Sequence, residues 1–236
     1  MSNLNMQPLK VTFTLSHPVV FDNEYSIHLD ALLAWARVQD AIETGCLNPW
    51  PEGDDLPLAR IGQGADWVWK ASRLFFTPET PRELINMQRK SDPEMFYKDF
   101  DEGLWAIRNK ASGIVSGKTP PKINTQSGQF RAYQYYVSAQ WMSKTEAWCI
   151  GDFDKVKALL DRITHIGKMG RAGFGTVADV AVEVDQEANW KWALRPLPMD
   201  VVPPVDVECE YAPVITTSRA PYWDKLKRTQ MMEPVL

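Results

Sequence analysis

The chain has 236 residues, of which 44% are hydrophobic and 24% charged, a composition typical of one large or two small globular domains. No apolar run approaches the ~20 residues of a membrane-spanning helix, and the N-terminus shows no secretory signal pattern. The three cysteines, Cys46, Cys149 and Cys209, form no C-x-x-C pair. We therefore expect reduced thiols, no metal, no cofactor and a cytoplasmic location.

The formal net charge of −4 hides a segregation of charge along the chain. Residues 103–145 contain no acid in 43 positions, and residues 162–178 contain three bases and no acid, while the rest carries 17 bases against 30 acids. This asymmetry favours a local surface that binds a polyanion, with chance clustering on a solvated loop as the alternative. The bases of the longer segment are Arg108, Lys110, Lys118, Lys122, Arg131 and Lys144.

In chain order, alternating apolar residues predict a first strand over 9–20, in which His17-Pro18 ends regular pairing. An apolar stripe with Trp35 on its flank predicts a helix over 28–42. Residues 48–64 are rich in Pro, Gly and Asp and predict a loop, and residues 66–76 predict a second strand. The long, weakly periodic segment 77–129 holds a possible strand at 104–107 and is typical of a functional or mobile insertion.

The second half of the chain adds further strands and one more helix. We predict strands over 130–142 and 147–150, a helix with Asp152 as its N-cap, and a strand over 176–184. A further strand is expected at 190–194, followed by a proline-rich arm and an aromatic, basic tail. The order approximates an α+β, ferredoxin-like βαββαβ fold over residues 1–194, with a basic insertion at about 77–130 and an extended part over 195–236.

Four glycines within nine residues, Gly167, Gly170, Gly173 and Gly175, mark the most informative segment, and His165, Lys168 and Arg171 lie among them. Glycines allow positive φ angles and bring backbone N–H groups close to a partner. The loop follows a helix and precedes a strand, the reverse of a dinucleotide-binding loop, and Gly167-Lys168-Met169 lacks the hydroxyl of a Walker A motif. Two interpretations remain: an anion-binding loop, or a glycine-rich turn with solvated charges.

Two segments carry a family resemblance. Residues 166–175, IGKMGRAGFG, resemble the G-rich loop of the CRISPR-associated RAMP superfamily, which follows the second ferredoxin helix and precedes the fourth strand. Residues 27–35, IHLDALLAW, are similar to the start of the type IV CRISPR subunit in the Cas-five position, and the chain length and the Trp- and Pro-rich C-terminal part fit that subunit.

This resemblance implies a non-catalytic subunit of a multisubunit effector ribonucleoprotein in antiviral defence. Such a subunit caps the repeat-derived 5′ handle of the guide RNA and touches the large subunit and the first backbone subunit. The resemblance does not decide whether the subunit also contacts the target DNA duplex. A thumb inserted within the fold covers the RNA, and the acid-free segment 103–128 is the candidate thumb here.

The expected RNA contacts combine charge, backbone amides and aromatic rings. Lys168 and Arg171 can neutralise phosphates, and glycine amides can donate to the same oxygens. Tyr133, Tyr135, Trp67 or Trp69 could stack on bases, although half-buried strand aromatics more often belong to a core. The full expected set is His165, Gly167, Lys168, Gly170, Arg171, Gly173 and Gly175 in the loop, and Arg108, Lys110, Lys118, Lys122 and Arg131 in the insertion.

Two alternatives stay open. Some members of the superfamily cut the CRISPR repeat RNA without metal, and His28 at the start of the first helix is the candidate catalytic residue for that activity. A structural role for His28 is the competing interpretation, and no compact cluster of His, Asp and Glu indicates metal catalysis. The other alternative is a protein-interaction scaffold that uses tryptophans as interface anchors.

Overall fold

The computed structural model describes residues 5–21, 27–64, 66–90, 92–104, 107–109, 113–115, 124–127 and 131–235. The chain divides into two compact units. The first unit combines Met1–Arg82 with Ala139–Leu236, and the second is Glu83–Ser138. No helix in the described part of the chain is long and apolar enough to cross a membrane.

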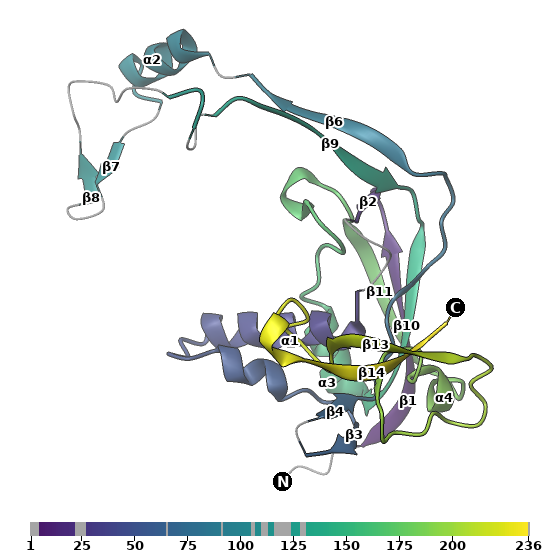
Figure 1. The fold of residues 1–236 in the computed structure, drawn as a ribbon. Helices are drawn as coiled ribbons and strands as arrows, with labels where there is room; N and C mark the ends of the chain where they lie inside the picture. The colour runs from purple at the N-terminus through teal and green to yellow at the C-terminus, as the bar shows by residue number, and fades with distance from the viewer. Residues whose placement is uncertain are drawn as a thin grey trace. The chain divides into compact units, whose positions relative to one another are not determined.

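A four-stranded antiparallel sheet of order β11-β1-β10-β5 forms the centre of the first unit (Figure 1). In the chain its strands alternate with two helices as β1-α1-β5-β10-α3-β11, which is the ferredoxin-like arrangement. The predicted α+β, ferredoxin-like core is therefore confirmed. Its elements are β1 (Met6–Leu15), α1 (Leu29–Glu43), β5 (Phe75–Phe76), β10 (Lys144–Asp152), α3 (Phe153–Leu160) and β11 (Val177–Val184).

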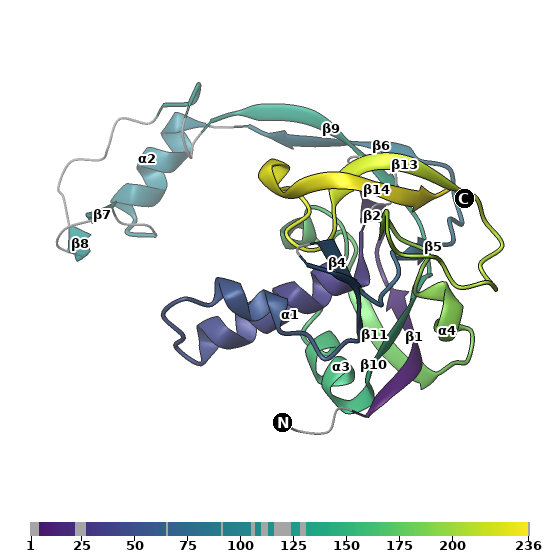
Figure 2. The same cartoon turned by 60° about the horizontal axis from the view of Figure 1, so that its bottom comes forward.

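One face of this sheet carries the hydrophobic core. Leu9, Val11 and Phe13 alternate along β1 and are fully buried in one cluster with residues of α1 and α3. Both helices lie on the same side of the sheet (Figure 2). The predicted N-cap of the second helix is confirmed, because the Asp152 carboxylate accepts a hydrogen bond from the Lys155 amide at 3.2 Å.

The strand predicted over 66–76 is divided in two. Its first part, β4 (Asp66–Trp69), pairs with β3 (Arg60–Gln63), which lies with the 3₁₀ helix η1 (Trp50–Asp54) in the segment predicted as a loop. Its last part, β5, pairs with β10. Between the two parts, the carbonyls of Trp69 and Ala71 each accept a hydrogen bond from the Arg195 guanidinium at 3.0 Å. A buried side chain thus holds the backbone where the predicted strand is interrupted.

The C-terminal residues belong to the same compact unit as the ferredoxin-like core. They form a three-stranded sheet of order β12-β14-β13 and pack through Leu197 and Met231 against Val68 and Trp192. The expected strand at 190–194 is wrong, because helix α4 (Ala188–Lys191) ends there and is followed by a turn, and Lys191 pairs with Glu187 one turn earlier. The sheet consists of β12 (Leu197–Pro198), β13 (Tyr211–Thr217) and β14 (Arg228–Pro234), with the 3₁₀ helix η4 (Lys225–Lys227) before β14.

A buried polar cluster joins the start of α1 to the C-terminal part. Arg195 is fully buried, and its guanidinium lies 3.4 Å from the Asp30 carboxylate and donates to the Tyr222 hydroxyl at 2.6 Å and the Ser218 carbonyl at 2.7 Å. The Tyr222 hydroxyl in turn donates to the Asp30 carboxylate at 2.8 Å. Burial opposes the charge of Arg195, but Asp30 and Tyr222 outweigh this effect and raise the pKa of Arg195.

His28 closes this cluster. Its ring is 5% exposed and stacks on the Tyr222 ring, with 4.3 Å between centroids and 14° between planes. Burial, and then the charges of Arg195 and Arg73, lower the pKa of His28 well below its usual range. The histidine is therefore neutral in the folded protein at neutral pH, and its role is to pack the N-terminal end of α1 against Tyr222.

The second unit contains the strands β6 (Glu83–Arg89) and β9 (Tyr133–Gln140), which are neighbours in one sheet. Between them lie α2 (Pro93–Asp101) and the paired strands β7 (Ile107–Asn109) and β8 (Gly113–Val115). The last residues of β9 already belong to the first unit, where they pair with β2 (Val19–Val20). The strand predicted over 130–142 is confirmed as β9, whereas the one expected at 104–107 begins only at Ile107.

The buried histidine generates a testable pH dependence. Because the folded-state pKa of His28 is lowered, the unfolded chain alone takes up this proton as the pH falls below the ~6.5 of an unperturbed histidine. The free energy of unfolding should then fall by up to ~1.4 kcal/mol per pH unit. Urea denaturation from pH 7.5 to 5 should show this loss in the wild type and a shallower loss in His28→Phe, which keeps the ring stacking. His17→Phe, at an exposed site, is the control; equal profiles for His28→Phe and the wild type would contradict the assignment.

Candidate functional site

The glycine-rich loop connects α3 to β11 and is fixed to residues 16–20 by its backbone. Its two stems pair through Ile166 N–H to the Gly175 carbonyl at 2.8 Å and Val177 N–H to the Thr164 carbonyl at 2.9 Å. Two further amides, those of Lys168 and Gly175, donate to the carbonyls of Val20 and Pro18 at 2.9 and 2.8 Å. The loop is therefore held on both sides by regular hydrogen bonds.

The glycines allow the backbone of the loop to pack closely against its neighbours. Gly175 has φ +61°, and a Cβ atom there would lie 1.8 Å from the Ile166 carbonyl oxygen. Gly167 has φ +86°, and its Cβ would lie 2.8 Å from the Val20 carbonyl oxygen. At Gly170 a Cβ would lie 2.9 Å from the ring of His165. The spacing of the glycines thus has a structural cause, which agrees with the interpretation of the loop as a glycine-rich turn.

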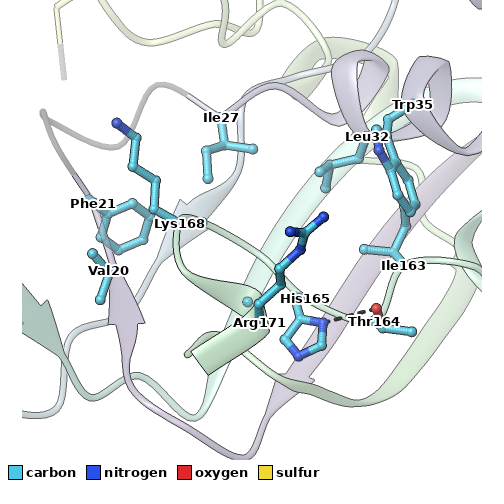
Figure 3. Close-up of a pocket in the computed structure, with 12 residues that line it drawn as sticks. Val20, Phe21, Ile27, Leu32, Trp35, Ile163, Thr164, His165, Lys168 and Arg171 are labelled. Carbon is cyan, nitrogen blue, oxygen red and sulfur yellow. Dashed lines mark hydrogen bonds between the residues drawn. The ribbon is translucent and has the colours of Figure 1, made fainter. Parts of the chain in front are cut away.

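Packing does not explain the polar side chains of the loop. Lys168 and Arg171 are exposed and His165 is half-buried, and all three line one cavity of about 790 Å³ (Figure 3). Among the residues that the structure describes, Arg171 has no ion-pair partner, and the amides of Gly170 and Arg171 have no acceptor. By contrast, the neighbouring base Arg162 pairs with Glu43 and with Asp40 of α1. The charge of Arg171, at the tip of the loop, is therefore available to an anion.

The opposite wall of the cavity is apolar. Leu32 and Trp35 reach it from α1, and Trp35 is 50% exposed. The sequence pattern places Trp35 only on the flank of the helix stripe, although its spacing of three from Leu32 puts both side chains on one helix face. The remaining apolar lining is Val20, Phe21, Ile27 and Ile163. None of the described lining residues is acidic, so the cavity combines a cationic edge with an apolar wall.

The bases expected in the insertion are only partly described. Arg131 is exposed just before β9, and Arg108 lies in β7 with its side chain outside the described part of the chain. Lys110, Lys118 and Lys122 lie outside the described residues. Lys144, the last base of the acid-free segment, pairs with Glu146 at 3.6 Å.

The candidate stacking residues fall into two groups. Tyr133 and Tyr135 are 42% and 43% exposed on β9, with ring centroids 5.4 Å apart. Trp69 is buried in the core, and the Arg60 guanidinium lies 4.4 Å from the ring centroids of both Trp69 and Trp67. The tyrosines are thus accessible to a base, whereas the two tryptophans are packed within the protein.

The alternative catalytic residue does not reach this cavity. His28 is buried against Tyr222 and is not among the residues that line the cavity. His165 is the histidine at the cavity, and its Nδ1 lies 2.9 Å from the Thr164 hydroxyl. Among the described residues no three His, Cys, Asp or Glu side chains are grouped closely enough to bind a metal ion.

The loop geometry predicts a sharp contrast between two glycine substitutions. Gly175→Ala places a methyl group against a backbone oxygen that cannot move aside, so the unfolding free energy should fall by about 3 kcal/mol or more. Gly173→Ala is the matched control, because Gly173 also has a positive φ, +88°, but no atom lies within 4 Å of its Cβ position. This variant should lose only the ~1–2 kcal/mol of a left-handed alanine. Urea denaturation measures both losses; equal losses would contradict the close approach.

Comparison with known proteins identifies the family of the chain. No curated protein matches the chain. The model of one family, CRISPR type IV associated protein Csf3, matches residues 7–234. This match includes the whole ferredoxin-like core, the insertion, the glycine-rich loop and the C-terminal sheet. The chain therefore belongs to the CRISPR type IV associated protein Csf3 family.

Proposed function

We propose that the protein is a non-catalytic, RNA-binding subunit of a type IV CRISPR effector complex. In this role it caps the repeat-derived 5′ handle of the guide RNA and contacts the backbone and large subunits. The family supports a part in a type IV CRISPR system. The resemblance to the subunit in the Cas-five position supports the two finer parts of the proposal, binding of the 5′ handle and contact with the backbone and large subunits.

The observation that carries this proposal is the cationic tip of the glycine-rich loop. Arg171, Lys168 and His165 all line one cavity, on a backbone that is hydrogen-bonded to residues 16–20. A guanidinium can bind a phosphate with two parallel hydrogen bonds, and an ammonium adds a point charge. Because RNA presents successive phosphates, this arrangement suits RNA better than an isolated carboxylate.

The geometry also favours binding over cleavage. A metal-independent ribonuclease needs a general base for the 2′-hydroxyl and an acid for the leaving oxygen, both in contact with the RNA. His28 is buried, and of the acid–base groups that such enzymes use, the described lining of the cavity offers His165 and Lys168 but no carboxylate or tyrosine. The cavity thus offers charge and shape, which fits a subunit that holds RNA without cutting it.

Charge reversal at the loop tip tests the proposal. In the purified effector complex, Lys168→Glu combined with Arg171→Glu should reduce guide RNA retention by at least about tenfold and flatten its dependence on salt, because about two phosphate contacts are lost. Retention is measured by RNA extraction after washes at increasing salt. Lys225→Glu with Lys227→Glu, a double reversal at exposed residues of η4, is the control. Unchanged retention in the loop variant, with an intact fold by circular dichroism, would rule out the loop as the RNA site.

A cleavage assay separates the two activities. The purified chain, incubated in chelator with a labelled transcript of its own CRISPR repeat, should leave the RNA intact over hours. The same assay with His28→Ala and His165→Ala identifies any catalytic histidine. Cleavage by the wild type that either variant abolishes would overturn the non-catalytic assignment.

A further inference from the structure

The cavity beside the glycine-rich loop has more apolar wall than phosphate binding requires. Cations and amides are sufficient to hold a phosphate. Six of the residues that line the cavity are nevertheless apolar, and they come from three places in the chain: Val20, Phe21 and Ile27 before α1, Leu32 and Trp35 on α1, and Ile163 after α3. A hollow with a cationic edge and an apolar wall suits a ligand that carries a phosphate next to a flat, apolar ring.

We infer that this cavity receives one unstacked nucleobase of the bound RNA, with Trp35 as its stacking surface and Arg171 on the adjacent phosphate. The inference rests on the proposed function and deepens it, because it assigns a base-binding site in addition to phosphate contacts. The volume of about 790 Å³ is within the range of roughly 300–1,000 Å³ that small-molecule sites occupy, and it accommodates a single nucleotide unit.

Trp35 is suited to stacking because its ring is accessible and the helix that carries it is firmly packed. Half of its surface is accessible, and it faces the cavity with Leu32 (Figure 3). The helix that carries it is rigidly held, since Leu29 and Leu33 are fully buried and Asp30 is bound by Arg195. A ring on a fixed element stacks on a base at low entropic cost.

The polar groups lie where the rest of a nucleotide would need them. The Arg171 guanidinium and the Lys168 ammonium come from the loop, on the other side of the cavity from α1 (Figure 3). The Thr164 hydroxyl and the His165 ring also line the cavity and offer hydrogen bonds to a base edge. A base held between these two sides must leave its stack, as bases in single-stranded RNA can. A free nucleotide shares this chemistry, so the test includes one.

The experiment uses the effector complex assembled around a synthetic guide RNA whose sequence is that recovered from the purified complex. The fluorescent base 2-aminopurine replaces one handle nucleotide at a time. In the wild type we expect one position whose emission is quenched by Trp35, with severalfold recovery in Trp35→Ala. Guide RNA affinity should fall by roughly tenfold in Trp35→Ala, the usual effect of removing one aromatic stacking surface. Trp35→Phe should restore most of the affinity.

A control variant distinguishes failure of the base-binding site from failure of RNA binding as a whole. Trp50→Ala removes a tryptophan that is 74% exposed but does not line the cavity, and it should leave affinity and fluorescence unchanged. If the Lys168→Glu, Arg171→Glu variant loses RNA while Trp35→Ala matches Trp50→Ala at every position, the base site is wrong and RNA binding stands. If neither variant loses RNA, both proposals fall. Binding of free AMP or UMP that needs Trp35, with guide retention unaffected, would overturn the RNA-base assignment in favour of a nucleotide site.

Discussion

The charge of a buried guanidinium must be compensated by groups around it, and Arg195 draws its partners from three distant parts of the chain. Its partners are the Asp30 carboxylate at the start of α1, two carbonyls at and just after the end of β4, and Ser218 and Tyr222 in the C-terminal part. These contacts fix where α1 begins relative to the sheet. The direction of α1 then determines that Trp35 lies at the cavity.

The cavity itself depends on a second constraint, the close approach of the glycine-rich loop to β2. Packing accounts for the glycines, because Gly167 and Gly175 lie against backbone atoms. It does not account for Arg171, which is exposed at the cavity and has no ion-pair partner among the described residues. The glycines thus build the turn, and under the proposed function this turn holds Lys168 and Arg171 where an RNA backbone would meet them.

The core could be predicted from sequence because its signals are local. Alternation along residues 9–15, the helical stripe from Leu29 and the N-cap at Asp152 all lie within one element. The break after β4 could not be predicted, because the Arg195 side chain that takes its carbonyls lies far downstream in the sequence. The position of Trp35 at the cavity also depends on tertiary packing. Helix α2 did have a local signal, Asp92 before Pro93, which the weak periodicity of the insertion obscured.

The way in which the insertion joins the core has a consequence for how the protein can vary. Its first and last strands, β6 and β9, are antiparallel neighbours in the same sheet, so the chain leaves and re-enters the first unit along adjacent strands. A loop whose ends are already paired changes length at little entropic cost. The segment between these strands can therefore be lengthened, shortened or exchanged between relatives while the ferredoxin-like core keeps its register. The fold thus separates a fixed scaffold from an interchangeable module.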